Sequence, residues 1–397
     1  MKPSILYLSY TGLLEPLGKS QILAYLSRLS KDYQYILVTY EKKDDFDEKE
    51  KVKELNEICK CYNVIWKPKI YHKNPRLLAT AWDLLLLLFY TFKYTKKYKI
   101  SLIHCRSYIP SISAYIVGKV TKIPFVFDMR ALWPEEMVDA DRLQRSSIVY
   151  KVLKFFEKKL LKNAGSVVSL THAAVPFLIS ENPSLSEQKF SVIPTCVDLD
   201  RFNKTLTNPS QDVVIGTMGT VISGWYHLDW LFETLKLSDI IFDKPSFKII
   251  TRDDNCKLNE FAHHYSLDNL TVKASTPESI QQNIKDISFA ILYFTAGVSK
   301  IGSAPTRMAE FLACGIPILG NRGVGDMADL IEKYNIGIVI EDGSTASLIT
   351  GLNKMKIFLT DPSYPERCKL AAEDLFSADM GSMKYKKTYQ RMLKQNS

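Results

Sequence analysis

The feature that most constrains the fold is a regular alternation of short apolar runs with segments of helix length. The runs are rich in Val, Ile and Leu and are nearly free of polar interruptions. They occupy residues 5–10, 35–40, 63–68, 101–106, 124–129, 166–170, 190–194, 212–219, 247–251, 270–274, 288–294, 316–320 and 336–340. Runs of this kind between helices are typical of parallel sheets that helices cover on both faces. We therefore predict an α/β protein built on doubly wound parallel sheets.

The strands fall into two series, which predicts two domains within the 397 residues. A polar stretch without core periodicity, 196–212, lies between the series. We place a first domain at 1–204 and a second at 205–375.

Charge and cysteine content narrow the function classes. The net charge of +9 is unevenly distributed. Residues 1–204 contain 32 Lys and Arg and 21 Asp and Glu, whereas residues 205–397 contain 20 Lys and Arg and 22 Asp and Glu. A basic half beside a near-neutral half predicts that one half meets an anionic surface, and we expect no nucleic-acid partner. Seven cysteines without a Cys-x-x-Cys pair and six scattered histidines favour neither a disulfide framework nor a metal site. The short first apolar run is a strand and not a signal peptide, so we expect a cytoplasmic protein.

Residues 77–92, LLATAWDLLLLLFYTF, contain one charge, Asp83, and lysines follow at 93, 96, 97 and 99. Sixteen residues are too short to cross the hydrocarbon core of a bilayer. The segment is therefore either a buried helix or an interfacial helix whose basic flank is attracted to anionic lipid.

The loop GLLEPLGKSQ (12–21) follows the first strand and resembles a phosphate-binding P-loop. Its glycines, however, are separated by five residues, and the P-loop needs four. No Gly-x-Gly-x-x-Gly follows either domain's first strand, which argues against a dinucleotide dehydrogenase. A second ligand-facing loop that includes Gly18 remains the expectation.

The segment FDMRALWPEEMVDADR (127–142) follows a strand end and contains five acids and two arginines. Ligands bind at the carboxyl ends of strands in open α/β sheets, which makes Asp128 and Arg130 candidate catalytic residues. Trp133 adds a flat face on which a sugar could stack. A solvated acidic loop is the alternative.

The segment SAPTRMAEFLACGIPILG (303–320) reads as a short helix between a turn and a buried strand. Ser303 is the expected N-cap, and the N–H groups of residues 303 to 306 would suit a phosphate. Glu310 lies on the helix side opposite to the apolar residues, where small neighbours leave room for a ligand. An exposed Glu on a surface helix is the alternative.

These segments resemble the family-4 retaining glycosyltransferases, whose GT-B fold has two facing Rossmann-like domains. In that family a segment like 303–317 binds the nucleotide sugar, with the acid equivalent to Glu310 on the ribose. The interdomain stretch SVIPTCVDLDRF (191–202) and the glycine turn IGTMGTVISGW (215–225) also match. EPLGKSQILAYLSRLS (15–30) and FDMRALWPEE (127–136) resemble a subgroup that assembles bacterial surface polysaccharide. The resemblance also implies that the C-terminal residues 376–397 form a helix that returns to the first domain.

The sequence departs from the family pattern at two places. Gly302 stands where the first of two glutamates is usual, and the Arg and Lys that usually follow the second domain's first strand are missing. Other groups must then bind the diphosphate. The candidates are Arg252, Lys300, Thr306, Arg307, Ser303, and the backbone at Gly219, Thr220 and 302–304.

The resemblance implies a retaining, metal-independent hexosyltransferase that moves a sugar from a nucleotide sugar, with UDP favoured, to a glycan or lipid-linked acceptor. No cofactor is expected beyond this donor substrate, and Gly18 and Asp128 would face donor and acceptor. The enzyme would work at the inner face of the membrane. A GT-B sugar-nucleotide epimerase, a two-lobed sugar-binding scaffold and an inactive relative are the alternatives.

Overall fold

The computed structural model describes residues 2–199, 202, 212–276 and 279–394. They divide into two compact units, the first Met1–Pro194 with Ala378–Ser397 and the second Thr195–Ser377. The boundary expected at 204/205 lies outside the described residues, and the structural division falls at 194/195 and 377/378.

The first unit contains a seven-stranded parallel sheet with the strand order β3-β2-β1-β4-β5-β6-β7. Its strands are β1 Ser4–Ser9, β2 Gln34–Glu41, β3 Val64–Ile70, β4 Leu102–Arg106, β5 Phe125–Asp128, β6 Ser166–Ser169 and β7 Phe190–Val192. Its helices are α1 Pro16–Gly18, η1 Lys19–Leu23, α2 Ala24–Leu29, α3 Lys43–Asp47, α4 Lys49–Cys61, α5 Arg76–Lys97, α6 Tyr108–Thr121, α7 Trp133–Asp139, α8 Ile148–Asn163, α9 Ala174–Glu181, η2 Glu187–Lys189 and α17 Ala378–Lys394.

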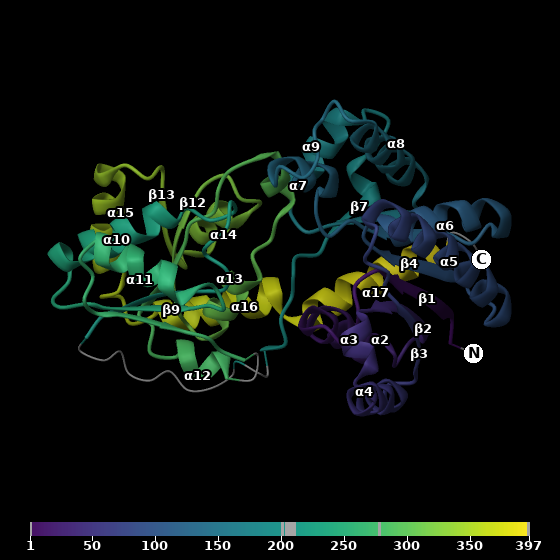
Figure 1. Cartoon of the computed structure of the whole chain (residues 1–397), viewed down its shortest axis with the longest axis horizontal. Helices are drawn as coiled ribbons and strands as arrows, with labels where there is room; N and C mark the ends of the chain where they lie inside the picture. The colour runs from purple at the N-terminus through teal and green to yellow at the C-terminus, as the bar shows by residue number, and fades with distance from the viewer. Residues whose placement is uncertain (1, 200–201, 203–211, 277–278, 395–397) are drawn as a thin grey trace. The chain divides into compact units, whose positions relative to one another are not determined.

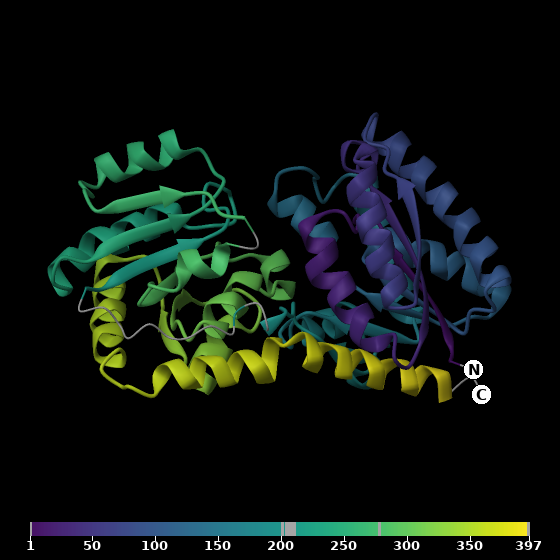
Figure 2. The ribbon, with the colours of Figure 1, turned by 90° about the horizontal axis from the view of Figure 1, so that it is seen from below.

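Right-handed crossovers place α5, α6 and α8 on one face of this sheet and α2 on the other. On the first face α5 packs against α6, and α6 against α8 (Figure 1). On the second face α17 packs against α2 and β4, and Figure 2 shows α17 in yellow passing the purple α2. A segment from the far end of the sequence thus completes the first unit.

The second unit contains a six-stranded parallel sheet with the order β10-β9-β8-β11-β12-β13. Its strands are β8 Val214–Met218, β9 Ser246–Ile250, β10 Leu270–Lys273, β11 Phe289–Leu292, β12 Ile318–Asn321 and β13 Gly337–Ile340. Its helices are α10 Leu228–Ile241, α11 Asn255–His264, α12 Ile280–Ile284, η4 Val298–Gly302, α13 Thr306–Ala313, α14 Met327–Tyr334, α15 Thr345–Phe358 and α16 Tyr364–Phe376.

Two apolar clusters form the core of the second unit, one on each face of the sheet. The first is built around α13, α14 and α16, and the second around α10, α11 and α15. The α/β fold with two parallel sheets is confirmed, since each of the thirteen expected strands forms within a few residues of its predicted bounds.

The expectations for residues 77–92 need correction. The helix extends from Arg76 to Lys97, 22 residues or about 33 Å, so the argument that it is too short for a bilayer was wrong. By length and composition alone, the segment Leu77–Lys97 is suited to crossing a membrane, although 28% of its most apolar part is buried against the rest of the protein. Asp83 is fully buried and accepts hydrogen bonds from Tyr10 Oη (2.8 Å) and His72 N (3.1 Å). The helix is therefore buried on one side and exposed on the other.

Candidate functional site

The start of α13 in the second unit differs from the sequence prediction. Pro305, with extended backbone, precedes the first helical residue, Thr306. Ser303 is not the N-cap, because a residue before proline is biased away from helical backbone and the helix starts later. The N–H of Ser303 donates to Lys300 O (3.0 Å), and Pro305 has no N–H. Of the four positions expected to bind phosphate, Ala304 and Thr306 keep an amide for that purpose.

The rest of α13 follows the prediction. Met308, Phe311 and Leu312 are buried in the core, and Glu310 lies half-buried on another side. Gly315, at φ +76°, ends the helix, where its N–H donates to Leu312 O and the next N–H to Phe311 O. This is a Schellman motif, which favours glycine because of the left-handed backbone.

Among the cations of this region, Arg307 has the best-defined surroundings. Its Nη2 donates to Thr220 O (3.2 Å), and its guanidinium lies 5.3 Å from the Phe294 ring centroid. The same guanidinium presses on Gly219, where a Cβ would be 2.7 Å from Nη2 and where φ is +85°. Among the described residues, the buried Nη1 atom has no hydrogen-bond partner. Burial lowers the pKa of Arg307 from its usual value. A desolvated guanidinium with an unused donor is suited to an anionic ligand.

The other predicted phosphate ligands have different settings. Lys300 is nearly buried, and its Nζ lies 3.1 Å from the centroid of the Trp225 ring. Gly302 is buried at the end of η4, and Arg252 is exposed just after β9. The structure thus brings together Arg307, Gly219 and Thr220, whereas Arg252 lies open to solvent.

In each unit, an acidic residue that follows or ends the neighbouring strand accepts hydrogen bonds from the backbone of the loop after the first strand. Glu41 accepts from the N–H groups of Leu13 (2.8 Å) and Leu14 (3.0 Å). Asp253 accepts from Val221 N (2.6 Å) and Ile222 N (2.9 Å). These amides, which a P-loop would offer to phosphate, are already satisfied by carboxylates, and sequence reasoning missed both acids.

Gly18 has a packing role in the first unit. A Cβ at this position would lie 2.2 Å from Gly12 O and 2.6 Å from the Leu13 Cα, so no larger residue fits. Its N–H donates to Glu15 O (2.9 Å). The close approach of two backbone segments therefore accounts for this glycine.

Asp128, at the end of β5, is fully buried. Its Oδ2 accepts from Tyr385 Oη (2.8 Å) and lies 3.4 Å from His104 Nε2, while Oδ1 is 3.9 Å from Arg130 Nη1. Burial would raise the pKa of Asp128, but Arg130 and His104 outweigh that effect and hold it below its usual value. An enclosed, ionised carboxylate of this kind orients its neighbours. We therefore assign Asp128 to positioning and not to direct contact with substrate.

Arg130 lies in the loop after β5 at φ +62°. Its Nη2 donates to Gln21 Oε1 (3.1 Å), and the same oxygen accepts from Arg106 Nη2 (2.6 Å). Arg106 is the last residue of β4 and so meets the same strand-end criterion as Asp128, although it was not among the predicted site residues. The indole of Trp133 packs against Tyr108, with ring centroids 5.5 Å apart.

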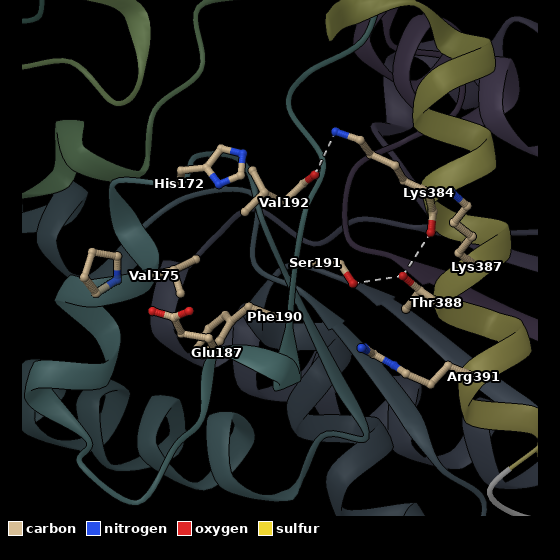
Figure 3. Close-up of a pocket in the computed structure, with 11 residues that line it drawn as sticks. His172, Val175, Glu187, Phe190, Ser191, Val192, Lys384, Lys387, Thr388 and Arg391 are labelled. Carbon is tan, nitrogen blue, oxygen red and sulfur yellow. Dashed lines mark hydrogen bonds between the residues drawn. The ribbon is translucent and has the colours of Figure 1, made fainter. Parts of the chain in front are cut away.

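A separate basic cavity of about 610 Å³ lies between α9, β7 and α17 (Figure 3). Lys384 Nζ donates to Val192 O (3.2 Å), and Arg391 donates to Ser166 Oγ (2.7 Å) and Gln188 O (2.9 Å). These cations fix α17 to the edge of the sheet. The cavity contains none of the predicted site residues.

Within the described ranges, no three His, Cys, Asp or Glu side chains gather in a way that could hold a metal ion. The candidate site consists of cations and backbone amides, with the carboxylates Glu310 and Asp128 apart from one another in sequence.

Comparisons with known proteins agree with this architecture. The model of Glycosyltransferase Family 4 matches residues 21–201. A glycosyltransferase from Rickettsia africae is 17% identical, with a TM-score of 0.71 and 99% of each chain covered. HepE from Anabaena, solved with UDP and glucose, is 13% identical, with a TM-score of 0.67 and 98% and 100% covered. The lipopolysaccharide outer core galactosyltransferase WaaB is 12% identical, with a TM-score of 0.66 and 96% and 98% covered. Among curated proteins, no relative matches the sequence.

Proposed function

We propose that this chain, whose residues 21–201 match the model of Glycosyltransferase Family 4 and whose fold is GT-B, transfers a sugar from a UDP-sugar to a lipid-linked or glycan acceptor. The transfer retains the anomeric configuration and serves the assembly of a bacterial surface polysaccharide. Relatives of the same fold include a protein solved with UDP and a lipopolysaccharide galactosyltransferase, which supports this choice of donor and pathway type.

The observation that carries the proposal is the setting of Arg307. Arg307 lies at the start of α13, and its side chain contacts Gly219 and Thr220. Its buried Nη1 has no hydrogen-bond partner among the described residues. Glu310 follows within one turn of the same helix. A cation for the phosphate and an acid for the ribose hydroxyl groups thus lie three residues apart on the same helix, which supports the proposal. Stabilisation of the departing diphosphate by Arg307 and by helix amides supplies the catalysis without a metal ion.

The acceptor side is proposed to work at a membrane. Leu77, Leu78, Trp82, Leu85 and Phe89 of α5 are each more than half exposed. The neighbouring helices extend this apolar surface through Val120 of α6 and through Ile148, Val152 and Phe155 of α8. Lysines at 93, 96, 97, 99, 119, 151, 158 and 159 lie among or beside these residues. Apolar side chains interleaved with lysine fit the interfacial region of an anionic bilayer.

The test is a donor screen by thermal shift across UDP-, GDP- and CMP-sugars, followed by transfer assays in excess EDTA. UDP-sugars are expected to stabilise the protein, and turnover is expected to continue in EDTA. Arg307→Gln should weaken binding of UDP far more than binding of uridine, because only UDP carries the diphosphate charge. Arg322→Gln, which removes an exposed arginine of the same unit, is the matched control. Equal losses of UDP and uridine binding, or no loss in either, would remove Arg307 from the phosphate site.

A further inference from the structure

A buried cluster in the first unit contains more positive than negative charge. Arg106, Arg130 and Asp128 are nearly or fully enclosed at the carboxyl ends of β4 and β5. Their neighbour His104 is also buried, and burial lowers its pKa below the usual value, so it is neutral near pH 7. Among these four residues, two guanidinium groups thus face one carboxylate.

The two guanidinium groups share a neutral acceptor. Gln21 Oε1 receives Arg106 Nη2 at 2.6 Å and Arg130 Nη2 at 3.1 Å. Among the described residues, the buried Arg106 Nη1 has no hydrogen-bond partner, and neither has Asp128 Oδ1. Burial and the charge of Arg130 both lower the pKa of Arg106. Burying two guanidinium groups beside one carboxylate and one shared amide oxygen is unfavourable, so the contacts among the described residues leave room for a second anion.

The backbone around the cluster is irregular. Ser107, directly after Arg106, has φ +73°, and Arg130 has φ +62°. Gln21 lies in the π-helix η1, Lys19–Leu23. Left-handed backbone at non-glycine residues and single π-helical turns both concentrate at functional sites, where a ligand offsets their cost.

We propose that Arg106 and Arg130 form an oxyanion site in which the Gln21 amide oxygen holds the place of a phosphate oxygen. A rotation of the Gln21 side chain would release both guanidinium groups to a phosphate. We assign this phosphate to the acceptor, as in a sugar linked to a lipid phosphate, because the donor phosphates have Arg307 in the second unit. The assignment to the acceptor rests on the proposed function, whereas the oxyanion site itself does not.

The first experiment places an anion at the site. Gln21→Glu puts a carboxylate against both arginines, so its melting temperature should exceed that of the parent. Inorganic phosphate should raise the melting temperature of the parent, at constant ionic strength, and should no longer affect Gln21→Glu. Gln390→Glu, the same change on the exposed side of α17, is the control and should keep the phosphate response. The parent and Gln21→Glu are also measured in the Arg307→Gln background, so that phosphate bound at the donor site does not contribute.

The second experiment removes a cation. Arg106→Gln should abolish the response to phosphate and leave the affinity for UDP unchanged. With acceptors that differ by one phosphate, its KM for the phosphorylated acceptor should rise about tenfold or more, with little change for the neutral one. Arg142→Gln, which changes an exposed arginine of the same unit, is the control.

These measurements separate the sources of the phosphate. Loss of UDP affinity in Arg106→Gln would assign the site to the donor and overturn the acceptor assignment. A phosphate response that persists in both Gln21→Glu and Arg106→Gln, or that depends on Arg307 alone, would overturn the oxyanion site. Absence of any sugar transfer would contradict the proposed function but leave the binding result interpretable.

Discussion

At the scale of single residues, Glu310 offers the most direct test of donor recognition. A carboxylate accepts hydrogen bonds from ribose hydroxyl groups more strongly than an amide does. Glu310→Gln should therefore weaken UDP binding by about 1–3 kcal/mol, the range for hydrogen bonds to charged groups. Calorimetric titration with UDP measures the effect, and the exposed Glu373→Gln is the control. Equal UDP affinity in Glu310→Gln and the parent would place the ribose elsewhere.

His104 gives the first unit a pH dependence. It is fully enclosed and lies 2.6 Å from Tyr389 Oη, and burial lowers its pKa in the folded state below the usual value of about 6.5. The unfolded chain therefore binds a proton that the folded chain does not, and stability falls as the pH drops below about 6.5. Unfolding free energies measured from pH 8 to 5 should show this decline.

The decline should be smaller in His104→Gln than in the parent, whereas the exposed His263→Gln should follow the parent. Parallel pH profiles for His104→Gln and the parent would mean that His104 is not the titrating group.

The sequence predicted the surroundings of some of these residues and not of others. Asp128 and Arg130 were found because charged groups at parallel strand ends lie near ligands, but the burial of Asp128 depends on Tyr385, which is 257 positions away. Arg106 met the same criterion within an apolar strand and was passed over. Carboxylates that fill loop amides, such as Glu41, depend on strand order, which no local pattern contains.

At the scale of elements, the helix α5 and its basic flank predict membrane binding that depends on charge. Each well-placed lysine should contribute about 1 kcal/mol, and the attraction should fade with salt. Replacing Lys93, Lys96, Lys97 and Lys99 by Gln should reduce flotation with anionic vesicles.

The matched control replaces four lysines of α4, at 49, 51, 53 and 60, on the other face of the sheet, and should float as the parent does. Failure of the parent to bind anionic vesicles at low salt would show that the surface of α5, α6 and α8 is not the docking surface. An equal loss of binding in both quadruple variants would show the same.

Strands were predicted more accurately than helices. The ends of a strand that is buried on both faces lie close to the ends of its apolar run, as in β5 and β12. The length of α5 was underestimated because the apolar run ends at Phe92, whereas the helix continues through lysines, which are good helix formers, to Lys97. The Ser303 cap failed for a similar reason, since Pro305 decides where α13 begins.

At the scale of the whole molecule, α17 connects the end of the second unit to the core of the first. Tyr385 Oη donates to the buried Asp128, so Tyr385→Phe leaves a buried carboxylate with one donor fewer. The first unit should lose about 1–3 kcal/mol of stability and the second unit none. Urea unfolding followed by hydrogen exchange of each unit resolves the two.

Tyr62→Phe, an exposed tyrosine, is the control. An equal loss in both units, or no loss in the first, would show that the hydrogen bond from α17 does not stabilise the first unit specifically.

The place of α17 also sets an order of assembly during synthesis. Residues 378–394 are made after the whole second unit, yet they cover β4 and supply partners to Asp128 and His104. The second unit therefore matures first, and the earlier-made sheet stays open to proteases until α17 arrives. Nascent chains stalled beyond residue 377 should yield a protease-resistant 195–377 fragment and a sensitive 1–194 segment. Equal resistance of both would show that the first sheet closes unaided.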